Sequence, residues 1–212
     1  MMETGFIKNL LSAISAIMAQ KRDYLIELDS VVGDGDLGLT MSDGFAAAAK
    51  AAAESGETDI GKLLYFAGKA MSSAVPSTMG TLMASGLMNA GRMLKGETSL
   101  DPGKIVLLFS SYADGVAARG GAKPGEKTFL DGILPAVNAL KSSLEGGASL
   151  DKAAGLAVNA AEEGYEHTQG MLAKHGRAAA RGEASRDLKD PGAQVAVFIM
   201  QGLADSIKEQ GR

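Results

Sequence analysis

The chain has 212 residues, of which 46% are hydrophobic and 22% are charged, and it contains no cysteine. This composition is typical of a folded globular protein, and the absence of cysteine excludes disulfides and thiolate metal sites, so a metal ion has to bind oxygen or histidine ligands. The net charge of −4 and the aromatic content of 5% argue against nucleic-acid binding, which depends on clustered Lys and Arg and on stacking aromatic side chains.

No proline- or serine-rich stretch and no block of charge divides the sequence, which predicts a single domain over residues 1–212. All apolar runs fall short of the roughly 20 residues that a membrane span needs. The N-terminus shows helical spacing instead of the apolar core of a signal peptide. We therefore expect a cytoplasmic protein with no membrane contact.

Helical spacing dominates the chain from its start. Apolar side chains recur every three or four residues from Phe6 to Leu28, which predicts a long amphipathic helix that ends at an acidic loop. Similar patterns or alanine-rich stretches predict further helices, in chain order, at 41–55, 60–73, 78–96, 103–118, 128–144, 150–173 and 193–210. The apolar runs KIVLLF and VAVFIM lie inside two of these patterns, so we interpret both as buried helix faces. The sequence predicts an all-α protein of about eight helices without a sheet.

Several predicted helix boundaries carry local signals. Thr58 or Asp59 can cap the helix that begins at residue 60, and Pro76 ends that helix. Asp101, followed by a proline, begins the helix at 103–118.

Four glycine-rich loops, at 29–38, 76–80, 119–127 and 176–193, follow every second predicted helix. In an up-and-down helical bundle, every second connection lies at the same end. We therefore expect these four loops to share one rim of the fold and to build one site.

The first of these loops gathers carboxylates without a neighbouring lysine or arginine. Asp34 and Asp36 are separated by one glycine, and the flanking glycines permit tight turns that bring both side chains together with Asp29. The spacing does not fit an EF-hand, because Thr40 stands where that motif has its bidentate glutamate. Mg²⁺ fits better, since it uses few carboxylates and takes its other ligands from water and phosphate. The residues predict a Mg²⁺ site, the alternative being a solvated acidic turn between two helices.

Four segments together resemble the L subunit of the phosphotransferase-system-dependent dihydroxyacetone kinases, whose nucleotide-binding domain is also part of ATP-dependent dihydroxyacetone kinases. They are LDSVVGDGDLGLTM (28–41), PSTMGTLMASGL (76–87), PGEKTFLDGILPA (124–136) and GRAAARGEASRDLKDPGA (176–193). The resemblance spans nearly the whole chain. It implies an all-α barrel of about eight antiparallel helices, with ADP or ATP and two Mg²⁺ ions at one rim.

The resemblance implies that Asp29, Asp34 and Asp36 hold the two Mg²⁺ ions against the nucleotide phosphates. Two ions suit the charge, because three carboxylates and a diphosphate of about −3 sum to roughly −6. The other residues that the resemblance places at the nucleotide are Leu37, Gly38, Leu39, Thr40, Thr78, Met79, Gly120, Phe129, Arg177, Asp190, Pro191 and Gly192. Arg181 and Arg186 are alternatives to Arg177, and Asp190 also suits the N-cap of the last helix.

The implied function is that of the ADP-binding subunit of a multi-subunit kinase without a protein nucleophile. Bound ADP would accept a phosphoryl group from a phosphocarrier subunit and pass it to dihydroxyacetone, or to a related small ketose, on a separate ketose-binding subunit. Two alternatives stay open: a non-catalytic regulatory or adaptor protein, and a subunit of a kinase that exchanges ATP directly. Formation of a homodimer is also left open. We expect His167 and His175 to lie in or at the end of a helix and not to carry a phosphohistidine.

Overall fold

The structure, a computed structural model, describes residues 1–210 of the chain. This range is mostly helical, with one pair of very short strands. In chain order its elements are β1 (Met2–Glu3), α1 (Thr4–Gln20), α2 (Arg22–Val32), α3 (Leu37–Glu54), α4 (Ile60–Ala74), α5 (Thr78–Met93), β2 (Ser99–Leu100), α6 (Pro102–Gly120), α7 (Phe129–Glu145), α8 (Leu150–His167), α9 (Gly176–Ala179), the 3₁₀ helix η1 (Gly182–Asp187) and α10 (Pro191–Gln210).

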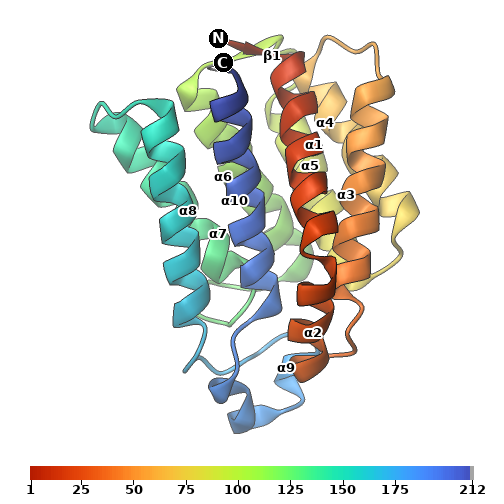
Figure 1. Cartoon of the computed structure of the whole chain (residues 1–212), viewed down its shortest axis with the longest axis vertical. Helices are drawn as coiled ribbons and strands as arrows, with labels where there is room; N and C mark the ends of the chain where they lie inside the picture. Colours follow the sequence, from red (N-terminus) through yellow and green to blue (C-terminus); the bar gives the residue numbers. More distant parts are fainter. Residues whose placement is uncertain (211–212) are drawn as a thin grey trace.

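The long helices pack against their neighbours in chain order (Figure 1). α1 contacts α3, successive pairs continue from α3 to α8, and α10 lies against both α8 and α1. The apolar stripes of these helices meet in one core, where side chains such as Phe6, Phe45 and Phe109 are almost completely buried. The predicted all-α class is therefore confirmed, and the runs KIVLLF and VAVFIM lie in α6 and α10 as expected. The barrel of eight antiparallel helices stays a prediction.

Two local features of the first half of the chain differ from the sequence prediction. The first predicted helix is two helices, because the backbone at Lys21 departs from helical geometry, with φ −96° and ψ 8°. Hydrogen bonds from Lys21 N to Ile17 O and from Leu25 N to Lys21 O bridge the break, so the apolar spacing continues through it. The prediction of no sheet was also wrong in detail, since β1 and β2 form an antiparallel pair with Met2 opposite Leu100.

Side-chain caps begin several helices where the sequence suggested. Asp59, and not Thr58, accepts a hydrogen bond from the N–H of Lys62 at 3.1 Å and caps α4. Asp101 caps α6 in the same way, with 2.8 Å to the N–H of Lys104. Helix termini leave N–H groups without partners inside the helix, and these carboxylates satisfy them.

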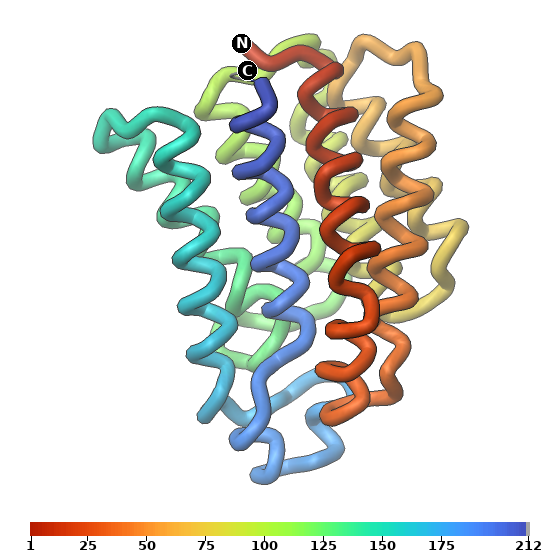
Figure 2. The backbone as a smooth tube through the Cα atoms, in the orientation of Figure 1, coloured from red at the N-terminus to blue at the C-terminus, as the bar shows by residue number. Residues whose placement is uncertain are grey.

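The four glycine-rich loops lie at the same end of the helices, the lower end in Figure 1 and Figure 2. Loops 29–38 and 176–193 are joined by an ion pair between Asp34 and Arg177. Loops 29–38 and 76–80 line a common pocket, and loop 119–127 is hydrogen-bonded to the chain just before α10. The N-terminus and the end of α10 lie together at the opposite end. None of the helices in the described range is long and apolar enough to cross a membrane.

Helices α4 and α5 approach each other closely through glycine. A Cβ atom at Gly61 would lie 2.4 Å from the carbonyl oxygen of Gly91, and one at Gly91 would lie 2.5 Å from that of Gly61. We expect Gly61→Ala to lower the free energy of unfolding by about 1 to 3 kcal/mol in urea titrations, because the helices must move apart.

Gly155 of α8 is the matched control, since a Cβ atom there would meet nothing within 4 Å. Gly155→Ala should leave stability unchanged or raise it by up to about 1 kcal/mol through helix propensity. Equal unfolding curves for Gly61→Ala and the wild type would contradict the close approach.

Candidate functional site

The turn between α2 and α3 depends on two of its glycines. Gly35 adopts φ +75°, in the left-handed region that side chains rarely enter. A Cβ atom at Gly38 would lie 2.1 Å from the carbonyl oxygen of Arg22, so only glycine lets the start of α3 approach α2 this closely. These two positions let the chain reverse within a few residues between α2 and α3.

The turn brings the three predicted aspartates together. One carboxylate oxygen from each of Asp29, Asp34 and Asp36 lies within 4.8 Å of the other two. Asp29 is half-buried at the end of α2, whereas Asp34 and Asp36 are exposed. Burial raises the pKa of Asp29, and the charges of Asp36 and Asp34 add to this, while the N–H groups of Leu37 and Gly35 oppose it. The cluster thus brings together like charges, and a cation that prefers oxygen ligands would stabilise it.

A cationic side chain already contacts this cluster. Arg177 of α9 donates a hydrogen bond to Asp34 and forms an ion pair with it. Arg181 instead donates to the carbonyl oxygen of Val32 at 3.3 Å, and Arg186 pairs with Glu183. Of the three arginines considered from the sequence, Arg177 is therefore the one whose guanidinium reaches a carboxylate of the acidic loop.

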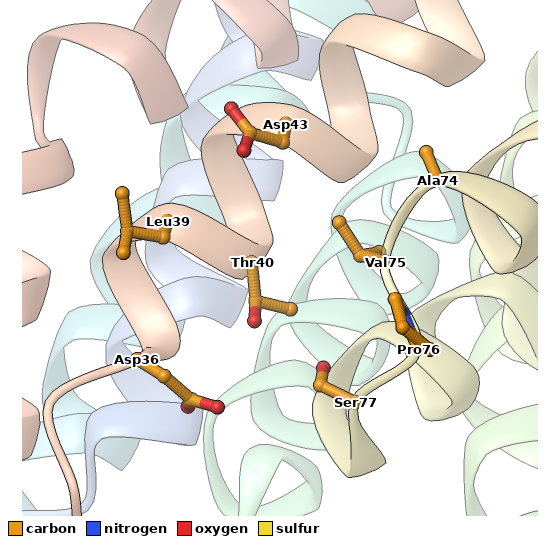
Figure 3. A pocket seen from close by; sticks show the side chains of 8 residues that line it. All are labelled: Asp36, Leu39, Thr40, Asp43, Ala74, Val75, Pro76 and Ser77. Atoms are coloured by element: carbon orange, nitrogen blue, oxygen red, sulfur yellow. The ribbon is translucent and has the colours of Figure 1, made fainter.

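Next to Asp36, a pocket of about 250 Å³ opens between the start of α3 and the turn before α5. Asp36, Thr40 and Ser77 point toward one another across it (Figure 3). Small-molecule pockets typically measure roughly 300 to 1,000 Å³, so this hollow accommodates only part of a nucleotide-sized ligand. The remaining lining residues are Leu39, Asp43, Ala74, Val75 and Pro76.

The other predicted nucleotide residues around α3 and α5 differ in exposure. Leu37 and Gly38 are buried against α2, and Leu39 faces the pocket. Thr78, the first residue of α5, is exposed, whereas Met79 is partly buried against the core. Ser77 was not predicted. Its hydroxyl caps α5 by accepting from the N–H of Gly80 at 2.9 Å, and a serine just before the helical pattern is the signal that could have found it.

A second group of predicted residues lies where α7 and α10 begin. Phe129 is buried, with its ring 6.0 Å from that of Tyr112. A Cβ atom at Gly192 would lie 3.1 Å from the backbone nitrogen of Phe129, so the starts of α7 and α10 touch. Pro191 is buried at the same place, whereas Gly120 is exposed at the end of α6, near Leu82 of α5.

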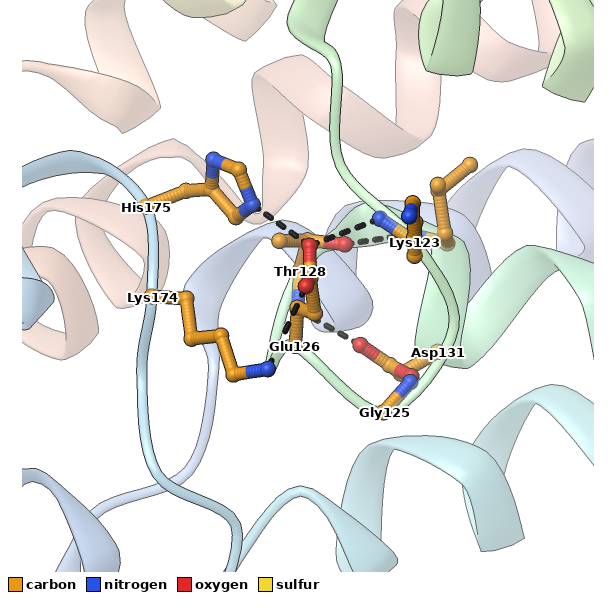
Figure 4. A network of polar contacts seen from close by, with 8 residues as sticks. Lys123, Gly125, Glu126, Thr128, Asp131, Lys174 and His175 are labelled. Carbon is orange, nitrogen blue, oxygen red and sulfur yellow. Dashed lines mark hydrogen bonds and ion pairs between the residues drawn. The ribbon is translucent and has the colours of Figure 1, made fainter.

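A polar network beside these helices was not predicted. Glu126 accepts a hydrogen bond from His175 at 2.7 Å and pairs with Lys174 at 3.3 Å (Figure 4). Its hydrogen bond with His175 is the largest of the causes that lower the pKa of Glu126 to about 2. Asp131 accepts from the N–H groups of Gly125 and Thr128 and completes a capping box at the start of α7.

The sequence T-x-x-D at 128–131 is the signal that could have found the capping box. The placement of His175 in or at the end of a helix is corrected, because α8 ends at His167 and His175 lies in the loop that precedes α9. His167 itself is the exposed last residue of α8.

Asp190 combines burial with a capping role. Its carboxylate accepts a hydrogen bond from the N–H of Ala193 at 2.7 Å, which confirms that it caps the start of α10. Burial raises the pKa of Asp190 to about 7, and the charge of Asp131 adds to this, whereas the N–H of Ala193 and the charge of Lys127 oppose it. The folded protein therefore binds a proton at Asp190 more tightly than the unfolded chain does.

This shift predicts a pH dependence of stability. The pKa of Asp190 rises from 3.8 to about 7 on folding, so its contribution to stability is fully present below pH 3.8 and is lost as the pH rises through 7. Relative to Asp190→Asn, which keeps an acceptor for Ala193 but cannot titrate, the wild type should lose at least about 1 kcal/mol between pH 4 and pH 7. Urea unfolding of both proteins across this range measures the difference, and parallel profiles would contradict the shift.

Comparisons with known proteins match the chain along most of its length. The DAK2 domain family matches residues 31–205. The ADP-binding subunit DhaL of the PEP-dependent dihydroxyacetone kinase of Escherichia coli is 35% identical over 203 residues, which cover 96% of this chain and 97% of that subunit. The L-erythrulose 1-kinase of Mycolicibacterium smegmatis is 32% identical over 202 residues, which cover 93% of this chain and 35% of that kinase.

A solved structure has the same fold. The crystal structure of the dihydroxyacetone kinase from C. freundii in complex with AMP-PNP and Mg²⁺ superposes with a TM-score of 0.72 at 22% identity, over 95% of this chain and 34% of that one. The resemblance found in the four loop segments is thus confirmed by a family match across most of the sequence and by a relative of the same length. The chain belongs to the DAK2 domain family.

Proposed function

We propose that this chain binds Mg-ADP and Mg-ATP at the loop rim and acts as the ADP-binding subunit of a multi-subunit kinase for dihydroxyacetone or a related small ketose. The observation that carries the proposal is the convergence of Asp29, Asp34 and Asp36 beside a pocket at the start of α3. Relatives that this chain matches are named as the ADP-binding subunit of a dihydroxyacetone kinase and as an erythrulose kinase, which supports both the nucleotide and the ketose.

The three carboxylates fit a pair of Mg²⁺ ions. Mg²⁺ prefers oxygen ligands, and three carboxylates share this cluster with one arginine, so a bound cation would offset their remaining negative charge. When bound, the ions would neutralise the phosphate oxygens and bridge them to the protein. Asp29, Asp34 and Asp36 would hold them in place, and the N–H groups at the start of α3 would face the phosphates.

Arg177 has a second role in this proposal. Its ion pair with Asp34 joins two exposed side chains, so it contributes about 1 kcal/mol or less and exchanges easily. If a metal ion binds Asp34, the guanidinium would become available for a phosphate group, two oxygens of which it can bind with parallel hydrogen bonds. Positioning and charge neutralisation would then carry phosphoryl transfer, with no nucleophile from this chain.

The relatives that match this chain over almost their whole length are named as subunits. We therefore place ketose binding on a separate subunit and propose that a phosphocarrier recharges the bound ADP. The nucleotide would act as a cofactor that stays in place between transfers. The rim that carries loops 29–38 and 176–193 would face both partners in turn.

The metal role predicts the effect of removing one carboxylate charge. Asp36→Asn should weaken binding of Mn²⁺ and of Mg-ADP at least about tenfold in calorimetric titrations. Its free energy of unfolding in a chelator should hold or rise, because repulsion within the cluster falls. Asp23→Asn is the matched control, since Asp23 is exposed on α2 and pairs with Arg22. Wild-type Mg-ADP affinity in Asp36→Asn would identify the cluster as a solvated turn.

The subunit role predicts a division of labour. The purified chain should carry about one nucleotide per molecule and release it when Mg²⁺ is chelated, yet it should not phosphorylate dihydroxyacetone from ATP. With a ketose-binding subunit it should support about one transfer for each bound ATP, and sustained turnover should require the phosphocarrier. A coupled assay with separate components tests this. Steady ketose phosphorylation by this chain with ATP alone would favour a self-sufficient kinase, and a chain that never binds Mg-ADP would refute the proposal.

A further inference from the structure

A buried lysine lies in the loop between α6 and α7. Lys127 is 2% exposed, and within residues 1–210 it is the only non-glycine residue with a positive φ, at 62°. Both features are unfavourable on their own, because a side chain crowds the left-handed backbone and a buried ammonium group loses its hydration. Strained residues of this kind persist only where the surrounding structure holds them, and they concentrate at functional sites.

The ammonium group of Lys127 is satisfied by backbone carbonyls. It donates to the oxygens of Met171, at 3.4 Å, Ser185 and Leu188, so three acceptors match its three N–H donors. All three belong to the segment 168–190, which connects α8 to α10 and includes α9 and η1. Because the acceptors are carbonyls spread along this segment, the contact fixes the path of its backbone and not the position of one side chain.

Apart from this anchor, the segment 168–190 is held mainly by polar contacts. Its internal hydrogen bonds include those from Gly170 N to Arg186 O, from Ala173 N to the Ser185 hydroxyl and from Asp190 N to the Thr168 hydroxyl, together with side-chain bonds from Gln169 and Arg186. Its apolar contacts form a small cluster separate from the main core, made of Val32, Ala173, Ala178 and Leu188. Segments with so few buried apolar contacts open locally at low cost in free energy, so the polar anchor matters more here than it would in the core.

A second contact, made by Glu126 beside Lys127, also joins the loop between α6 and α7 to the segment 168–190. The carboxylate of Glu126 contacts the side chains of His175 and Lys174 in the segment (Figure 4). Its backbone carbonyl accepts a hydrogen bond from the N–H of Lys174 at 3.3 Å. Glu126 thus binds the segment just before α9, whereas Lys127 binds it near its start, at Met171, and again near its exit into α10.

We propose that Lys127 is a positioning residue of the nucleotide site, which holds the segment 168–190 across the rim. With the segment in place, Arg177 faces Asp34, and Asp190 caps α10 where it touches α7. The inference rests on the proposed function for its ligand, because Arg177 and Asp190 are the residues through which the segment would retain Mg-ADP. Lys127 itself acts through the segment, because its three donors are taken up by carbonyl oxygens.

The test compares Lys127→Met with Lys123→Met. Methionine keeps an apolar stem of similar length and removes the three donors, and Lys123 is an exposed lysine of the same loop. Without nucleotide, trypsin should cut Lys127→Met after Arg177, Arg181 or Arg186 at least about tenfold faster than the wild type, the effect expected from losing one or more charge-assisted hydrogen bonds. ADP release in the presence of Mg²⁺ should accelerate by a similar factor.

Two further readouts separate positioning from a general loss of stability. Binding of Mn²⁺ alone should not weaken in Lys127→Met, because its ligands lie on α2 and in the turn before α3. Helical circular dichroism should also be unchanged, and Lys123→Met should match the wild type throughout. Wild-type rates of cleavage and ADP release in Lys127→Met would overturn the proposal, as would a lower melting temperature with an unchanged rate of ADP release.

Hydrogen exchange on the wild type keeps the proposal testable if Lys127→Met does not fold. The amides of Gly170, Ala173 and Asp190 should exchange as one unit, faster than the core helices, and should slow when Mg-ADP binds. Independent exchange of these amides would overturn the proposal. If the wild type binds no Mg-ADP, the proposed function fails, and the proteolysis without nucleotide still decides whether Lys127 holds the segment.

Discussion

The repulsion between three carboxylates is the constraint around which this rim is built. The turn at Gly35 and Gly38 brings one carboxylate oxygen from each of Asp29, Asp34 and Asp36 to within 4.8 Å of the other two, although like charges at this distance oppose folding. Local conflicts of this kind, in which a sequence works against its own stability, are expected at functional sites. The proposed divalent cations would relieve this conflict, and the phosphates that they bind would bring the surrounding loops to one ligand.

Other helices add a pocket wall and a positive charge to this cluster of carboxylates. The start of α5 adds a polar pocket wall through Ser77, and α9 adds a positive charge through Arg177. Lys127 and Glu126 connect the remaining loop to the segment that carries Arg177. Four parts of the chain that are far apart in sequence therefore depend on one another at one end of the fold, while the core fixes the helices from which they emerge.

Much of this arrangement could be predicted from the sequence, because the features concerned are local or periodic. Helical spacing identified the long helices, the alternation of glycine-rich loops predicted their common end, and the Asp-Gly-Asp turn identified the carboxylate cluster. The break at Lys21 left no trace, since hydrogen bonds across it preserve the helical spacing. The strands were too short, at two residues each, for any alternation to be visible.

The role of Lys127 could not be predicted for a different reason. A lysine between two polar residues is normally exposed, and its burial depends on carbonyl groups 44 to 61 residues further along the chain. Those carbonyls have no sequence signature, because every residue has one. His175 was misplaced for a related reason, since its partner Glu126 is 49 residues away.

The most direct test of the account is a crystal structure of the chain grown with ADP and Mn²⁺, with the metal located by its anomalous scattering. The account predicts Mn²⁺ peaks bound to Asp29, Asp34 and Asp36 and bridged to the diphosphate, with the nucleotide extending along the loop rim. A nucleotide bound elsewhere, or Mn²⁺ held by the diphosphate without these aspartates, would contradict it.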